Sequence, residues 1–192
     1  MQSSPTQNSS GRKTLLILAV VFLMPFTLAA TLHLVGWKAS ARSYGELVNP
    51  PQSLQLPDLS DAQGQPFSAK QWEKKWTMVM VASACEAACQ AQLQTLQNLR
   101  TSLAKDTERL QLILLLTADS KILPPQKVTV LMGADVADFS SQFKVAGQPT
   151  PQAGRVYLVD PLGNLMMSYA SGFEPKGVRH DLTRLLKNSW AG

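Results

Sequence analysis

The two cysteines of the chain are the residues whose type and spacing could do chemistry. The 192-residue sequence holds Cys85 and Cys89 in the stretch VASACEAACQAQL, with three residues between them. Cysteines four positions apart on a helix share one face, with Cβ atoms about 5–6 Å apart. This distance permits a structural disulfide, a redox pair or two thiolate ligands of a soft ion such as Cu(I). The spacing alone leaves all three uses open.

The cysteines stand where a buried strand is expected to meet a helix. The run WTMVMVA at 76–82 is nearly all apolar, which is typical of a strand buried on both faces. A helix is predicted from about 86 to 104, with an apolar face formed by Cys85, Cys89, Leu93, Leu96, Leu99 and Leu103. We therefore expect Cys89 to point inward with the leucines and Cys85 to be more exposed. This order predicts Cys85 as the attacking thiol and Cys89 as its shielded partner.

The position of the pair favours a functional role over a purely structural disulfide. A bridge that closes so short a loop stabilises little, because the entropic benefit grows with loop length. The N-terminus of a helix stabilises a thiolate, whereas Glu86, between the cysteines, opposes this effect. A structural clip remains the alternative interpretation.

The rest of the chain after residue 53 has an α/β pattern. Further apolar runs of strand length lie at 110–116, 127–132, 155–160 and 164–170. The last two flank the turn sequence DPLG and are predicted to form a hairpin. Two more helices are expected at 135–143 and about 174–189. Strands that alternate with helices predict a mixed sheet with helices on both faces.

The N-terminal part contains a predicted transmembrane helix. Residues 14–37 include no Asp, Glu, Lys or Arg. At about 1.5 Å per residue they span roughly 36 Å as a helix, enough to cross a hydrocarbon core of about 30 Å. A cleaved signal peptide is the alternative, since Ala39-Ser40-Ala41 is similar to a cleavage site, but its apolar region would normally be about 7–15 residues. We predict a permanent single-span anchor.

The predicted organisation has four parts. They are a disordered tail at 1–13, the transmembrane helix at 14–37, a Pro-rich linker at 38–52 and one domain at 53–192. The net charge of +5 is spread out, without a basic run that carries interleaved aromatic residues, so no nucleic-acid partner is expected. The bulk of the chain follows the span, which predicts that the C-terminal domain is exported.

Several motifs together resemble the Sco/SenC family. They are the single anchor, the Pro-rich linker, the CxxxC that opens a helix, the later hairpin YLVDPLGNLM and the segment VTVLMGADVADFSSQFKV. The stretch SDAQGQPFSAKQWEKKWTMVMV is similar to the family's opening hairpin and first core strand. The resemblance covers about residues 50–190 and implies a thioredoxin-like domain in a membrane-anchored protein of cytochrome c oxidase assembly.

The resemblance also implies a copper site, which this sequence matches only in part. In the family two cysteines and a histidine bind copper, and Cys85 and Cys89 match the cysteine positions. Gln152 stands where the histidine is expected, five residues before Tyr157. The two histidines of the chain do not replace it: His180 is predicted on the solvated face of the last helix, and His33 near the membrane interface. The third ligand of a Cu(I) ion is therefore unassigned.

Two functional hypotheses follow from different classes. The first is a thiol protein in a bacterial inner membrane, with its domain in the periplasm, that serves a cytochrome c oxidase subunit or its assembly factors. It would act by thiol–disulfide exchange, copper transfer or both through Cys85 and Cys89. The second is a non-catalytic, membrane-tethered binding module in which the cysteines form a structural disulfide.

Overall fold

The computed structural model describes residues 9–35, 43–118, 126–145 and 151–189. The chain divides into two compact units. The first unit, Met1–Arg42, holds the helix α1 (Ser9–Leu34). An 18-residue window of its segment Gly11–Leu34 has a mean hydropathy of 2.5, and the length and composition of this segment would allow it to cross a membrane. The helix begins inside the predicted disordered tail, whose residues 1–8 lie outside the described part.

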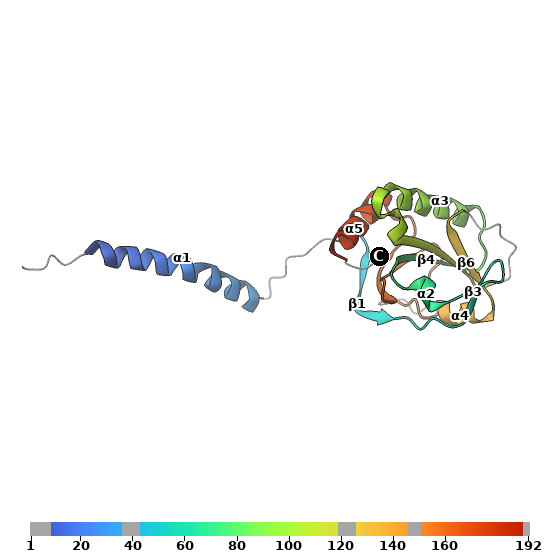
Figure 1. The fold of residues 1–192 in the computed structure, drawn as a ribbon, viewed down its shortest axis with the longest axis horizontal. Helices are drawn as coiled ribbons and strands as arrows, with labels where there is room; N and C mark the ends of the chain where they lie inside the picture. Colours follow the sequence, from blue (N-terminus) through green and yellow to red (C-terminus); the bar gives the residue numbers. More distant parts are fainter. Residues whose placement is uncertain (1–8, 36–42, 119–125, 146–150, 190–192) are drawn as a thin grey trace, which may run out of the picture. The chain divides into compact units, whose positions relative to one another are not determined.

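The second unit, Ser43–Gly192, has an α/β fold in which helices flank a mixed sheet, as predicted (Figure 1). Its strands are β1 (Glu46–Ser53), β2 (Leu59–Asp61), β3 (Pro66–Phe67), β4 (Trp76–Ala82), β5 (Leu110–Leu116), β6 (Val128–Met132), β7 (Val156–Val159) and β8 (Asn164–Tyr169). Its helices are α2 (Ala69–Trp72), α3 (Ala87–Ser102), the 3-10 helix η1 (Ala104–Arg109), α4 (Ala134–Ser140) and α5 (Pro175–Asn188).

Strand β4 lies inside the sheet, whose order is β1-β8-β7-β4-β5-β6-β2-β3 among the described strands. It pairs in parallel with β5, from Trp76 opposite Leu110 to Ala82 opposite Leu116. It pairs antiparallel with β7 on its other side, and β7 forms the predicted hairpin with β8. The strands expected at 76–82 and 110–116 thus coincide with β4 and β5.

The sheet has a hydrophobic core on each face. Met78 and Met80 of β4 belong to the core that includes α3 and α5, whereas Val79 and Val81 belong to the core that includes α4. Figure 1 shows α3 and α5 on one side of the sheet and α4 on the other. Since successive side chains of a strand point to opposite faces, the apolar run of β4 serves both cores. This double burial explains why the run does not alternate with polar residues.

Strand β1 contains residues 46–52 of the predicted Pro-rich linker. It is an edge strand that pairs antiparallel with β8, and the pairing register shifts between Leu47 and Gln52. Proline cannot donate to the ladder and is found at edge strands and bulges, which is where Pro50 and Pro51 lie. That residues 53–192 fold as a domain by themselves stays a prediction.

The start of the second unit is held by a buried carboxylate. Asp181 of α5 is 1% exposed, and its Oδ2 accepts hydrogen bonds from the backbone N–H groups of Tyr44 at 2.8 Å and Gly45 at 3.0 Å. Burial, and then the negative charge of Asp181, raise the pKa of the neighbouring Tyr169 phenol. Asp181 therefore fixes the segment that leads into β1.

Replacing Asp181 should destabilise this unit. We expect Asp181→Ala to lower the free energy of unfolding by about 2–3 kcal/mol, because the backbone donors of Tyr44 and Gly45 lose a charged acceptor. Denaturant unfolding of the full chain in detergent, followed by near-UV circular dichroism, measures the change. The exposed Asp138 provides the control, since Asp138→Ala removes the same charge and should shift stability by less than about 0.5 kcal/mol. Equal effects of the two changes would contradict the role of Asp181.

Candidate functional site

Cys85 and Cys89 form a disulfide at the end of β4. Their Cα atoms are 5.0 Å apart, within the usual range of about 4.4–6.8 Å for disulfides. Cys85 lies just before the N-cap residue of α3, Glu86, and Cys89 lies in the first turn of that helix. The structure therefore brings together both residues that the sequence singled out.

The exposure of the two cysteines is the reverse of the prediction. Cys85 is 9% exposed and belongs to the core that contains Met80 and Leu93, whereas Cys89 is only partly buried. Helix α3 begins at Ala87, so Cys85 precedes the helix and its side chain joins the core. Cys89 continues the leucine face and packs against the same core, but it also lines an open cleft, which leaves it partly exposed.

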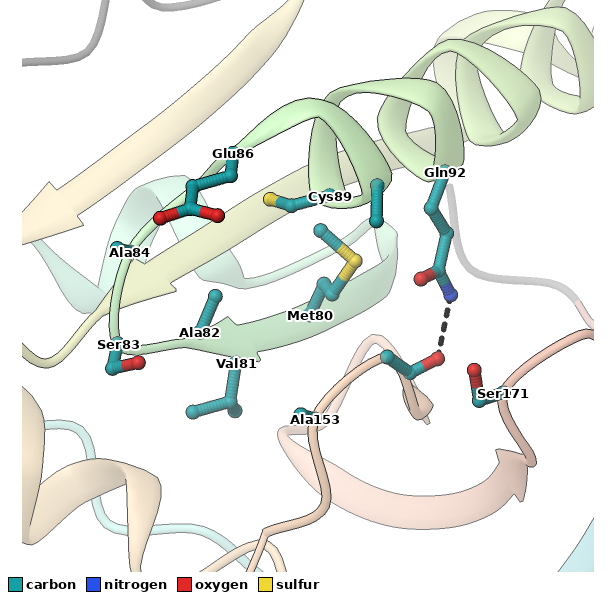
Figure 2. A pocket seen from close by; sticks show the side chains of 12 residues that line it. Met80, Val81, Ala82, Ser83, Ala84, Glu86, Cys89, Gln92, Ala153 and Ser171 are labelled. Carbon is teal, nitrogen blue, oxygen red and sulfur yellow. Dashed lines mark hydrogen bonds between the residues drawn. The ribbon is translucent and has the colours of Figure 1, made fainter.

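An open cleft of about 460 Å³ reaches the disulfide on the Cys89 side (Figure 2). Cys85 is not part of its lining. The lining residues come from the end of β4, the first turns of α3, the segment before β7 and the segment after β8: Met80, Val81, Ala82, Ser83, Ala84, Glu86, Ala88, Cys89, Gln92, Ala153, Gly154 and Ser171. Most of these side chains are small, so the backbone of another molecule could approach the sulfur of Cys89 closely.

A hydrogen bond joins the two walls of the cleft. The side chain of Gln92, on α3, donates from Nε2 to the backbone oxygen of Gly154 at 2.6 Å. Gly154 has φ +76°, and a Cβ there would lie 2.8 Å from Oγ of Ser171. Glycine adopts this backbone conformation without strain and leaves room for the close approach of Ser171. Gln92, Gly154 and Ser171 are site residues that the sequence reasoning missed, although Gln92 follows Cys89 by one helical turn.

Gln152, at the position expected for a histidine ligand, does not line the cleft. Its side chain is exposed, and its backbone N–H donates to the hydroxyl of Tyr157 at 3.2 Å. Burial raises the pKa of Tyr157, with a smaller opposing effect from this hydrogen bond and from Arg155. Gln152 therefore serves the local backbone, and Tyr157 is a neutral phenol at neutral pH.

The described residues place no third His, Asp or Glu ligand beside the two sulfurs. They contain no group of three or more His, Cys, Asp or Glu side chains that could hold a metal ion. His180 is 61% exposed on α5 and packs edge-on against Tyr44, with ring centroids 5.8 Å apart. Neither Gln152 nor His180 therefore lines the cleft that reaches Cys89.

Comparison with known proteins gives a family and a fold. Residues 76–189 match the family described as the transmembrane-like, thioredoxin-like, C-terminal domain. No curated protein sequence matches the chain.

Solved structures of Sco proteins share the fold. The solution structure of apo Sco1 from Thermus thermophilus is 21% identical, with 77% of this chain and 99% of that chain covered and a TM-score of 0.56. Yeast Sco1 with copper bound is 18% identical over 71% and 90% of the two chains, with a TM-score of 0.57. BsSco, described as a member of the Sco family of cytochrome c oxidase assembly proteins with a disulfide switch, is 14% identical over 73% and 96%, with a TM-score of 0.54. The resemblance to Sco/SenC proteins is confirmed in the fold.

Access to the disulfide should depend on Gly154. We expect Gly154→Ala to destabilise the chain by about 1–2 kcal/mol, because alanine is strained at this positive φ. We also expect it to slow reduction of the disulfide by dithiothreitol, because the new Cβ crowds Ser171 and the hydrogen bond from Gln92. Gly172→Ala is the matched control, since Gly172 has φ +74° with nothing within 4 Å of the added Cβ. Equal reduction rates in the two variants would show that the cleft does not control access.

Proposed function

Because the chain belongs to the family of transmembrane-like, thioredoxin-like C-terminal domains, we propose that it is a membrane-anchored thiol protein that exchanges its disulfide with cysteines of a partner protein. The observation that carries this proposal is the disulfide between Cys85 and Cys89. Cys89 lines an open cleft, whereas Cys85 is buried in the core. Exchange requires access of an attacking thiolate to one of the two sulfurs.

The difference in burial assigns an order to the proposed exchange. A partner thiolate attacks Sγ of Cys89, a mixed disulfide forms, and Cys85 leaves as a thiolate. In the opposite direction the thiolate of Cys89 attacks a partner disulfide and releases one partner thiol. Cys85 then attacks Sγ of Cys89 and releases the second. This order replaces the expectation that Cys85 attacks first.

Helix α1 supports the membrane part of the proposal. Gly11–Leu34 is long and apolar enough to span a bilayer, and Pro25 inside it is tolerated better by membrane helices than by soluble ones. We infer a single-span anchor in a bacterial inner membrane, with the second unit in the periplasm. The oxidising periplasm permits a disulfide.

Cytochrome c oxidase assembly is the proposed setting. It is supported by the shared fold with BsSco, described as a member of a family of cytochrome c oxidase assembly proteins. The proposed partners are the cysteines of an oxidase subunit or of another assembly factor.

Single cysteine variants test the proposed order of exchange. In the reduced full chain in detergent, Cys85→Ser leaves the half-buried Cys89, and Cys89→Ser leaves the buried Cys85. We expect Cys85→Ser to form a mixed disulfide with oxidised glutathione at least roughly tenfold faster, because exchange rates follow access to the thiolate. The mixed disulfide is measured by mass spectrometry after acid quenching. A faster reaction of Cys89→Ser would reverse the order.

The reduction potential of the wild-type pair separates exchange from a structural clip. Equilibration of the full chain with glutathione or dithiothreitol buffers, followed by alkylation of free thiols, gives this potential. Exchange predicts a value above about −300 mV, whereas a structural disulfide is typically below it. A value well below this limit, with no reaction of either single variant, would favour the non-catalytic binding module.

Carriage of Cu(I) is the second candidate function, and the copper-bound structure of yeast Sco1 is the observation that favours it. The residues present fit it only in part, since they supply two thiolates when reduced and the described residues contain no group of three or more His, Cys, Asp or Glu side chains that could hold a metal ion. We therefore expect the reduced full chain, titrated anaerobically with Cu(I), to yield its copper to bathocuproine disulfonate. One retained copper per chain, lost in a variant with both Cys85→Ser and Cys89→Ser, would contradict this expectation and support a copper carrier.

A further inference from the structure

Glu86 carries the only charged side chain among the described residues that line the cleft. It is the N-cap residue of α3, but its side chain forms no capping hydrogen bond with the helix. Glu86 lines the cleft, and Figure 2 shows the sulfur of Cys89 turned toward the Glu86 carboxylate. The remaining polar side chains of the lining, Ser83, Gln92 and Ser171, are neutral. The charge of the cleft near Cys89 is thus set by one carboxylate.

The negative charge of Glu86 is not neutralised within the described part of the chain. Glu86 is exposed and forms no ion pair with any described basic residue. When the cysteines are reduced and Cys89 attacks as a thiolate, a second negative charge develops in the same cleft. A neighbouring cation on the incoming molecule would be attracted by both charges, and an anion would be repelled.

We propose that Glu86 determines the specificity of exchange and selects partner disulfides whose sulfur is flanked by a cationic group. The inference rests on the proposed exchange function and names its class of substrate. The small side chains of Ala84, Ala88 and Ala153 on the walls leave room for the partner backbone, so charge rather than shape discriminates among partners. The natural partner would present Lys or Arg beside its reactive cysteine.

The reaction to be tested consumes one disulfide per protein dithiol. The thiolate of Cys89 attacks a disulfide RS–SR, the new bond joins Cys89 to one SR group, and the other leaves as RS⁻ and takes up a proton. Cys85, as its thiolate, then attacks Sγ of Cys89, which forms the Cys85–Cys89 disulfide and releases the second RS⁻. The protein is oxidised by two electrons, and the small disulfide is reduced to two thiols.

Three small disulfides of different charge probe the selectivity. Reduced full chain in detergent is mixed at pH 7 and low salt with cystamine, which is cationic, with neutral bis(2-hydroxyethyl) disulfide, or with anionic 3,3′-dithiodipropionate. The rate ratio of cystamine to the neutral compound is compared between variants, which cancels the intrinsic reactivity of each reagent. We expect Glu86→Gln to lower this ratio about two- to fivefold, the range of an exposed ion pair, and to raise the relative rate of the anion. Glu86→Lys should lower the ratio further.

The control variant removes an equivalent charge away from the cleft. Glu73 is exposed and precedes β4, at the opposite end of that strand from the cysteines, so Glu73→Gln should leave the ratio unchanged. The effect of Glu86→Gln should also shrink at high ionic strength, because salt screens exposed charges. If all three disulfides react and the ratio is the same in wild type, Glu86→Gln and Glu86→Lys, the role of Glu86 is overturned but the exchange function is not. No reaction with any disulfide would overturn the exchange function itself.

Discussion

The burial of β4 on both faces is the constraint on which the position of the disulfide depends. Met78 and Val79 are both fully buried, one in each core. The parallel ladder with β5 continues to Ala82, whose carbonyl still accepts a hydrogen bond from the N–H of Thr117 at 3.0 Å. The chain then has only a few residues in which to leave the sheet and begin α3 at Ala87. The cysteine pair consequently lies at the carboxyl end of β4, the end of parallel strands where ligand-binding crevices usually form.

The central strands and the long helices of the second unit could be predicted from the sequence because their buried faces leave a regular pattern of apolar residues. Runs such as 76–82 and 110–116 carry little else than apolar residues, and the leucines of α3 repeat at helical spacing. Strand β1 could not be recognised in this way, since most of its residues are exposed and it contains two prolines. Its place comes from long-range contacts. Arg155, just before β7, donates to Glu46 of β1 at 2.7 Å and to Ser168 of β8 at 2.8 Å.

The candidate site could be predicted in its chemistry but not in its surroundings. The spacing of Cys85 and Cys89 permitted the disulfide that the structure contains. The order of exposure was wrong because helical periodicity tells which face of the helix a side chain is on, and not that a cleft opens beside Cys89. The wall of the cleft that contains Gly154 could not be predicted for another reason. Gly154 is 62 positions from Gln92, and only the folded sheet brings the two into contact.

The unequal burial of the two sulfurs has a chemical consequence beyond the order of attack. In the proposed exchange, a mixed disulfide on Cys89 has two fates, attack by Cys85 or attack by a second external thiol. Cys85 lies in the core and its Cα atom is 5.0 Å from that of Cys89, so it is close to Cys89 and shielded from other molecules. Intramolecular attack therefore has a high effective concentration, whereas the side reactions of an exposed second thiol are suppressed. The same short connection from β4 to α3 places Glu86 between the two cysteines, so the sulfurs that would attack and resolve in the proposed exchange, and the charge that would face the partner, lie within one helical turn.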